Sequence, residues 1–295
     1  MNNQNLKIKK SDFKVSIYVP VYNGQKTIKD CINSILSQSK KFDEIIIIND
    51  CSTDMTLDIL KQFTNIKIIN NKKNFGLSKS RNIGIKNCIH DVVASIDADI
   101  ILDSNWLLKI ISHLKEDDIV LCGGNTKEKN LNNVFNKWRS EYYGLSWGKN
   151  NKINPPFIYG SNSIQFKSLW YETKGYDENL KTAGDDINYT NRVNLLNKYK
   201  TCYVSDAICH HLQEDNLNSL ANRVWRYHVS GYKIQKVSYF RSCKLIIKQF
   251  KFFFIRSLKN ITKLEINYIL INLYILFYFI FIEIKFLIQR KKYVS

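Results

Sequence analysis

Residues 44–54 have the sequence EIIIINDCSTD, and this stretch decides the fold class. The four consecutive isoleucines Ile45–Ile48 show no alternation between apolar and polar residues, so they predict a strand that is buried on both faces. Two polar residues, Asn49 and Asp50, end the apolar run. Continuous apolar strands of this kind are typical of a parallel sheet that is covered by helices on both sides.

The same pattern repeats on both sides of this stretch. Further apolar runs predict strands at residues 15–19, 66–69, 92–96 and 119–122. Runs with helical spacing lie between them, at residues 26–37, 54–63, 78–88 and 105–114. We therefore predict an α/β fold whose sheet is mostly parallel and whose ligands bind beyond the carboxyl ends of the strands.

The composition fits a globular protein. The chain has 295 residues, of which 44% are hydrophobic, so it can bury a core, and global disorder is excluded. Its seven cysteines show no C-x-x-C spacing, which predicts reduced, packed thiols in a cytosolic protein. Residues 1–14 are polar and basic, so we expect no secretory signal peptide.

The sequence Asp97-Ala98-Asp99 closes the strand at residues 92–96. In an extended segment, residues i and i+2 project the same way, so both carboxylates could face one point. Two close carboxylates repel each other unless a cation lies between them, and hard oxygen ligands suit Mg²⁺ or Mn²⁺. The alternative is a polar turn or the N-cap of the helix that follows.

Two other polar side chains occupy places that a ligand could reach. Asp50 follows its strand directly, where it could accept a hydrogen bond from a base or ribose, or could be solvated in a loop. Gly76 permits a tight turn into the next helix, and Arg81 lies one turn later. Its guanidinium could meet a nucleotide or its phosphates, or could lie on the surface. Asp54 is interpreted as a helix N-cap.

The order of these motifs resembles that of family 2 glycosyltransferases, which have the GT-A fold. In chain order the motifs are Val19-Pro20-Val21-Tyr22-Asn23, Asp50-Cys51-Ser52-Thr53-Asp54, Asn74-x-Gly76-x-x-x-Ser80-Arg81-Asn82, Asp97-x-Asp99, Gly160-Ser161-Asn162, Gly175-Tyr176-Asp177-Glu178 and Gly184-Asp185-Asp186. The resemblance covers about residues 14–211. It implies a Rossmann-like sheet with helices on both faces, and sugar transfer from a nucleotide-diphosphate sugar.

The resemblance also implies roles for single residues. The nucleotide-sugar donor would be held by Pro20, Tyr22, Asn23, Asp50, Arg81 and Asp97. Asp97 and Asp99 would bind the metal cofactor, Mn²⁺ or Mg²⁺. The donor-sugar and acceptor side would be lined by Gly160, Asn162, Asp177 and Glu178.

The family inverts the anomeric carbon by direct displacement, so a carboxylate must deprotonate the acceptor hydroxyl. Asp186 matches the catalytic base. Asp185 stands where the family has Glu, which leaves the choice between the two aspartates open, and one of them would cap the following helix. His210 and His211 lie where related enzymes place a histidine near the metal, with a packed histidine as the alternative.

The signature Q-x-x-R-W of processive polysaccharide synthases is absent, because Leu220 and Val224 stand where Gln and Trp would be needed around Arg223. We therefore predict single additions from a UDP-sugar to a glycan or glycolipid hydroxyl. A polyprenyl-phosphate sugar synthase is the nearest alternative. A non-catalytic membrane- or nucleic-acid-binding protein is another, although we expect no nucleic-acid partner.

The basic excess is concentrated near the end of the chain. Residues 222–295 carry 15 Lys or Arg and two acids, a net charge of +13 out of +18. We predict a catalytic domain at residues 12–215 and, at residues 216–295, a helical extension that associates with the cytoplasmic side of a membrane. In-plane or re-entrant association is preferred, because a single span would carry the basic residues 290–292 to the far side, and a single span is the second choice. A helix packed on the protein is the soluble alternative.

Overall fold

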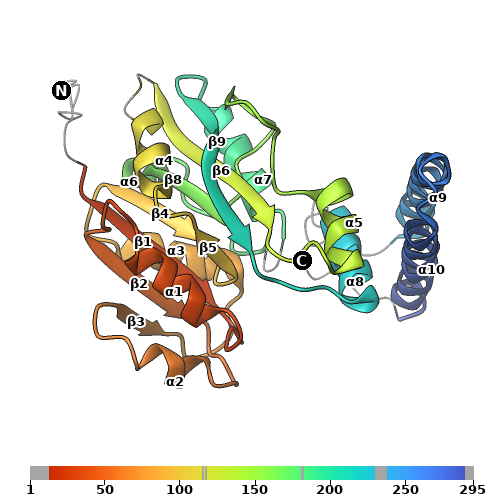
Figure 1. Ribbon diagram of the computed structural model, residues 1–295, viewed down its shortest axis with the longest axis horizontal. Coiled ribbons are helices and arrows are strands. Elements are labelled where there is room, and N and C mark those ends of the chain that lie inside the picture. Colours follow the sequence, from red (N-terminus) through yellow and green to blue (C-terminus); the bar gives the residue numbers. More distant parts are fainter. Residues whose placement is uncertain (1–12, 115, 117, 181–182, 230–237, 290–295) are drawn as a thin grey trace.

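The structure is a computed structural model that describes residues 13–114, 116, 118–180, 183–229 and 238–289. Its centre is a nine-stranded sheet in which eight strands follow the order β3-β2-β1-β4-β8-β6-β9-β5, and β7 pairs with β9. Figure 1 shows this sheet with helices on both faces. The α/β fold class and the helical C-terminal region are therefore confirmed.

The first half of the chain forms the parallel part of the sheet. Its strands are β1 (Val15–Val21), β2 (Glu44–Asn49), β3 (Lys67–Asn70) and β4 (Val92–Ile96). The helices between and after them are α1 (Ile28–Leu36), α2 (Thr56–Leu60), α3 (Leu77–Asn87) and α4 (Trp106–Leu114). Because β1 pairs in parallel with both β2 and β4, their carboxyl ends share one edge of the sheet.

The second half of the chain adds antiparallel pairs, which the apolar runs alone did not predict. Its strands are β5 (Ile100–Leu102), β6 (Ile119–Glu128), β7 (Lys152–Ile153), β8 (Asn162–Phe166) and β9 (Lys200–His211). Strand β8 is antiparallel to both β4 and β6, whereas β6 and β9 are parallel. The predicted strand at residues 119–122 was too short, because β6 continues to Glu128. The remaining helices around the sheet are α5 (Val134–Tyr143), α6 (Lys167–Glu172) and α7 (Asp185–Asn194).

The two faces of the sheet build separate cores, because successive strand side chains point to opposite sides. Ile45 and Ile47 of β2 pack with α1 and α4, whereas Ile46 and Ile48 pack with α3, α6 and α7. All four isoleucines are buried. This arrangement explains the unbroken apolar run from which the fold class was predicted.

Three helices follow β9: α8 (Leu217–Val229), α9 (Tyr239–Thr262) and α10 (Ile266–Ile288). They share a third core with α5, which is centred on the fully buried Trp138. Figure 1 shows α9 and α10 side by side at one end of the molecule, with α5 and α8 between them and the sheet. The predicted division at residue 215 falls in the connection between β9 and α8.

Among the described residues, one helix, α10, is long and apolar enough to cross a membrane. Length and composition alone are weak evidence, because the core helix of a soluble protein can satisfy the same criterion. The basic residues 290–292 lie outside the described residues.

Candidate active site

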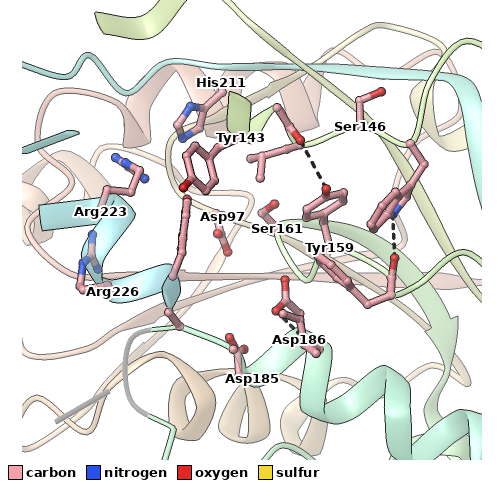
Figure 2. A pocket seen from close by; sticks show the side chains of 18 of the residues that line it. Asp97, Tyr143, Ser146, Tyr159, Ser161, Asp185, Asp186, His211, Arg223 and Arg226 are labelled. Carbon is pink, nitrogen blue, oxygen red and sulfur yellow. Dashed lines mark hydrogen bonds between the residues drawn. The ribbon is translucent and has the colours of Figure 1, made fainter. Parts of the chain in front are cut away.

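A cleft of about 690 Å³ lies where β4 ends. One side of it is formed by residues that follow β4, by residues that precede β8 and by the start of α7, and the other side by α5 and α8. Figure 2 shows Asp97, Asp185 and Asp186 facing this space, with Arg223 and Arg226 across from them. The two acidic motifs of the sequence therefore meet in one cleft.

Asp97 and Asp99 both line the cleft, as the i, i+2 spacing predicted. Asp97 accepts a hydrogen bond from Arg81 at 2.8 Å, and Asp99 lies 3.3 Å from Nε2 of His211. Burial raises the pKa of Asp97 to about 6, and the nearby Asp99 carboxylate adds to this effect although Arg81 opposes it. Burial is thus the main cause of the raised pKa of Asp97, and the attraction of Arg81 does not offset it.

The pair of carboxylates that line the cleft, Asp97 and Asp99, fits a divalent cation. Within the part of the chain that the structure describes, no group of three His, Cys, Asp or Glu side chains forms a complete metal site. Mg²⁺ and similar ions are commonly bound by one or two carboxylates together with substrate phosphates. Asp97 and Asp99 would supply the two carboxylates, and a diphosphate would supply the remaining oxygens.

Arg81 connects the two acidic motifs. It is buried in α3, donates to Asp97 and places Nε 3.3 Å from Oδ2 of Asp185. The backbone of Gly160 packs directly against its guanidinium, and a Cβ at that position would lie 1.8 Å from Nη1 of Arg81. The alternative of a surface arginine is therefore wrong, and Arg81 fixes the positions of both carboxylates.

The structure distinguishes Asp185 from Asp186. Both line the cleft, but Asp185 is buried and paired with Arg81 at the start of α7, whereas Asp186 is only partly buried and has no ion pair with Arg81 (Figure 2). Asp186 accepts hydrogen bonds from the backbone N–H of Ile187 at 2.8 Å and of Gly160 at 3.4 Å. Burial, and next the negative charge of Asp185, raise the pKa of Asp186 to about 7. A carboxylate with this pKa can exchange a proton near neutral pH.

The structure also distinguishes the two histidines. His210 binds Asp103 at 2.9 Å and does not line the cleft, whereas His211 does. Burial alone would lower the pKa of His211, but Asp99 and Glu128 outweigh it and raise the pKa to about 9. His211 is therefore a cation beside Asp99 in this arrangement.

The residues expected to hold the base lie at the same sheet edge but are not part of the wall of the cleft. Pro20 is buried in β1, and Tyr22 is half exposed just after it. Asn23 accepts a hydrogen bond from the backbone N–H of Thr53 at 2.8 Å, which joins the loops after β1 and β2. Asp50 is buried rather than solvated.

The carboxylate of Asp50 accepts hydrogen bonds from the side chain of Asn71 and from the backbone N–H groups of Phe75 and Gly76, at 2.7 to 2.9 Å. Asp50 thus holds the turn before α3, the helix that carries Arg81. The interpretation of Asp54 as the N-cap of α2 is wrong by one residue, because Met55 occupies that position; Asp54 precedes it and accepts from the backbone N–H of Thr56.

Three predicted residues lie outside the wall of the cleft. Asn162 is fully buried, with its amide bonded to Trp106 at 2.7 Å, so it has a structural role. Asp177 accepts from Asn179, and Glu178 binds Lys79 at 3.0 Å. Gly160 contributes through its backbone, as described above.

The far wall was missed by the sequence analysis. Three partly buried aromatic side chains pack together there, with ring centroids 4.8 to 5.7 Å apart: Trp147, Phe157 and Tyr159. Arg226 makes no hydrogen bond or ion pair within the described residues, and its pKa is lowered by burial and by the neighbouring Arg223. Of these residues and Arg223, the sequence analysis mentioned only Arg223, and only because the Q-x-x-R-W signature around it is absent.

Comparison with known proteins agrees with this arrangement. The sequence profile of glycosyl transferase family 2 matches residues 16–176. An "uncharacterized glycosyltransferase" of Haemophilus influenzae is 39% identical over 118 residues, which cover 39% of this chain and 36% of the relative. A poly-beta-1,6-N-acetyl-D-glucosamine synthase of Staphylococcus epidermidis is 26% identical over 231 residues, which cover 75% of this chain and 55% of the relative. The chain thus spans about half or less of the length of these relatives.

Two solved structures share the fold. The mannosyltransferase PcManGT from Pyrobaculum calidifontis, in complex with GDP-Man and Mn²⁺, superposes with a TM-score of 0.60 at 15% identity, covering 75% of this chain and 64% of that one. S. aureus TarS 1-349 in complex with UDP-GlcNAc superposes with a TM-score of 0.52 at 20% identity, covering 74% and 66%. At these identities the likeness establishes the fold alone.

Proposed function

This glycosyltransferase belongs to glycosyl transferase family 2, and on that premise we propose that it transfers one sugar at a time from a UDP-sugar to a hydroxyl of a glycan or glycolipid. We further propose that the reaction inverts the anomeric carbon and depends on a divalent metal. The observation that carries the proposal is the meeting of Asp97 and Asp99 with Asp186 in one cleft, with Arg81 paired to Asp97 and to Asp185.

The proposed metal is Mn²⁺ or Mg²⁺, held by Asp97 and Asp99. When bound, it would stabilise the negative charge that develops on the departing diphosphate. PcManGT, which shares the fold, was solved with Mn²⁺ and a nucleotide sugar. The position of the two carboxylates of Asp97 and Asp99 in one cleft supports the same assignment for this chain.

In the proposed mechanism, Asp186 is the catalytic base. It takes the proton from the acceptor hydroxyl while that oxygen forms its bond to the anomeric carbon and the bond to the diphosphate breaks. Its pKa of about 7 means that the carboxylate is available to accept a proton at neutral pH. Asp185 keeps Arg81 in place, so the two aspartates have different roles.

Arg223 and Arg226 form a cationic wall opposite the aspartates (Figure 2). Arg223 places Nε 3.3 Å from Asp215, which is also bound by Arg139, so Asp215 neutralises it only in part. Arg226 is the freer of the two. We assign both to the diphosphate of the donor, because guanidinium groups bind phosphate oxygens with charge-assisted hydrogen bonds.

The aromatic group of Trp147, Phe157 and Tyr159 is proposed as the acceptor contact. Tyr159 is a neighbour of Asp186 (Figure 2), and burial, and next the charge of Asp186, raise the pKa of Tyr159. Half-buried aromatic rings offer flat apolar surfaces to the C–H face of a pyranose, while neighbouring polar groups orient its hydroxyls. In this proposal, the sugar acceptor lies beside the base.

We also propose that the chain works at the cytoplasmic side of a membrane, with a lipid-linked glycan as the acceptor. The net charge of +13 over residues 222–295 and the apolar helix α10 support this location. The cationic wall would also suit a phosphate acceptor, as in a polyprenyl-phosphate sugar synthase. Such an acceptor needs no strong base, so activity that survives Asp186→Asn would favour that alternative.

A panel of nucleotide sugars tests the proposal directly. The melting temperature is measured with UDP-GlcNAc, other UDP-sugars and GDP-mannose, each with Mn²⁺, Mg²⁺ or a chelator. We expect stabilisation by one UDP-sugar only when metal is present, because ligands that bind the native state raise its stability. Nuclear magnetic resonance of the product then gives the anomeric configuration. Equal stabilisation with the chelator would contradict the metal assignment, and a retained configuration would contradict inversion.

A further inference from the structure

Helix α10 has two faces of different character. Its inner face is buried against its neighbours and contains Tyr268, Ile271, Ile275 and Phe279. Its outer face is apolar along the whole helix, with side chains 37 to 77% exposed and spaced by three or four residues. These outer residues are Ile266, Leu270, Leu273, Phe277, Phe281, Ile284 and Ile288.

Helix α9 is also exposed and apolar on one side, with a basic border. The exposed apolar residues are Ile247, Phe250, Phe254, Leu258 and Ile261. Lys244, Lys248 and Lys251 are exposed on the same helix and, at 100° per residue, fall at the edge of this apolar side. An apolar stripe with a lysine border is the pattern of a helix that lies at a lipid interface.

Buried hydrogen bonds hold α10 to the rest of the protein. Glu283 is fully buried and accepts from Trp225 of α8 at 2.9 Å and from Ser242 of α9 at 2.8 Å. Nearer the start of the helix, Asn272 accepts from Trp138 of α5 at 3.0 Å. Helix α10 is thus attached at two levels to three other helices.

These attachments limit how α9 and α10, which together form a helical hairpin, can contact a membrane. If α10 crossed the bilayer alone, Glu283 and Asn272 would lose their partners inside hydrocarbon, which is costly. If α9 crossed with it, three lysines would enter the hydrocarbon core. Contact along the outer face requires neither change.

We propose that α9 and α10 form an in-plane dock for an anionic lipid surface. The partner is a membrane rather than a second copy of the chain, because two copies would bring the exposed lysines of one hairpin close to those of the other. Anionic headgroups are complementary to the same lysines. The inference builds on the proposed membrane association but not on the transfer chemistry.

The dock is connected to the cleft through the end of α5. Glu141, Tyr142 and Tyr143 line the cleft, and all three also contact α9. Lys259 binds Glu141 at 2.8 Å, and Arg256 donates to the hydroxyl of Tyr143 at 2.9 Å. A hairpin lying on the lipid surface therefore holds this wall of the cleft close to headgroup-linked acceptors.

Vesicle binding of the full chain, without any sugar donor, tests the dock. Vesicles of phosphatidylcholine are compared with vesicles that also contain phosphatidylglycerol. We expect the anionic vesicles to bind, and the double variant Phe277→Gln/Phe281→Gln to bind about tenfold more weakly or worse, because two exposed rings leave the interface. The matched control Ile89→Gln/Leu195→Gln removes two exposed apolar residues elsewhere and should bind like the parent. Equal binding by both double variants would overturn the proposal.

Depth measurements separate in-plane docking from a span. A fluorophore is attached at Leu270→Cys, Phe277→Cys or Ile284→Cys in a parent with Cys51→Ser and Cys243→Ser, and lipid-borne quenchers report its depth. In-plane docking predicts the same shallow depth at all three sites, whereas a span predicts a deep middle site. A deep middle site would refute the proposal. The proposal would also be refuted if light scattering shows a dimer that Phe277→Gln/Phe281→Gln dissociates, and if the parent does not bind vesicles.

Discussion

The two walls of the cleft have different origins. The acidic wall consists of short segments that directly follow strands or begin a helix. Arg81 holds Asp97, His211 pairs with Asp99, and the backbone N–H groups of Gly160 and Ile187 donate to Asp186. The opposite wall consists of α8, the end of α5 and a long loop, and carries Trp147 and Arg226. In the proposed function, the acidic wall holds the metal and the catalytic base, whereas the opposite wall binds the donor diphosphate and the acceptor. Substitutions in the two walls should therefore differ in kind and in size.

The largest effect is expected for Asp99→Asn. Loss of one metal-binding carboxylate should lower kcat by roughly 1,000-fold, since electrostatic stabilisation of the leaving group is worth several kcal/mol. Metal-dependent turnover and circular dichroism measure activity and folding. Asp103→Asn is the matched control, because Asp103 binds His210 outside the cleft. A similar loss in both variants would show that the effect is not specific to the cleft.

Asp186→Asn should lower kcat by roughly 100- to 1,000-fold, since the amide cannot accept the proton of the acceptor hydroxyl. The dissociation constant of the donor, measured by calorimetry, should change little, because the proposed base contacts the acceptor. Undiminished kcat would remove Asp186 from the mechanism and favour a phosphate acceptor.

The pH dependence should follow Asp186. Its pKa is raised to about 7, so the carboxyl is protonated and inactive as a base below that pH. We expect kcat to fall about tenfold per pH unit below 7 and to level off above it. Asp185→Asn should move the midpoint to lower pH, because the charge of Asp185 contributes to the raised pKa. An unchanged midpoint would mean that another group limits the rate.

Arg226→Ala should raise KM for the donor by roughly tenfold, since a charge-assisted hydrogen bond to phosphate is worth about 1.5–3 kcal/mol. Unlike the aspartate variants, it should leave the pH midpoint in place. Arg226→Lys keeps the charge but not the two-pronged geometry and should recover part of the affinity. If KM for the acceptor rises instead, Arg226 belongs to the acceptor site.

The smallest effect is expected for Trp147→Ala. KM for the acceptor should rise roughly fivefold, since one aromatic contact is worth about 1 kcal/mol, while KM for the donor stays constant. Trp147→Tyr should recover most of the affinity because it retains a flat ring. Trp170→Phe, outside the cleft, is the matched control. A change in donor affinity alone would contradict the acceptor assignment.

The sequence predicted the acidic wall because parallel strands place their carboxyl ends at one edge. The strand at residues 92–96 was located correctly, and Asp97 and Asp99 follow from it. The choice between His210 and His211 was left open, although Ala207 and Cys209 of β9 are buried and the period of two would have turned His211 inward. The alternation of side chains along β9 thus identifies the histidine that faces inward, which the His210-His211 pair alone does not.

The opposite wall could not be predicted in the same way. Trp147 lies in a loop without periodicity, and its position depends on how α5 and β8 are placed in three dimensions. Arg226 is one of many basic residues near the end of the chain, and only the packing of α8 turns it toward the cleft. The antiparallel pairing of β8 with β4 likewise depends on a long-range contact.

The close packing of Gly160 on Arg81 has an evolutionary consequence. A side chain at position 160 would displace the guanidinium, so a lineage could gain one there only after losing the arginine at position 81. That loss would release Asp97 and Asp185 together. The two positions should therefore vary as a pair among descendants of this protein, and a sequence with a bulky residue at one and arginine at the other should be rare.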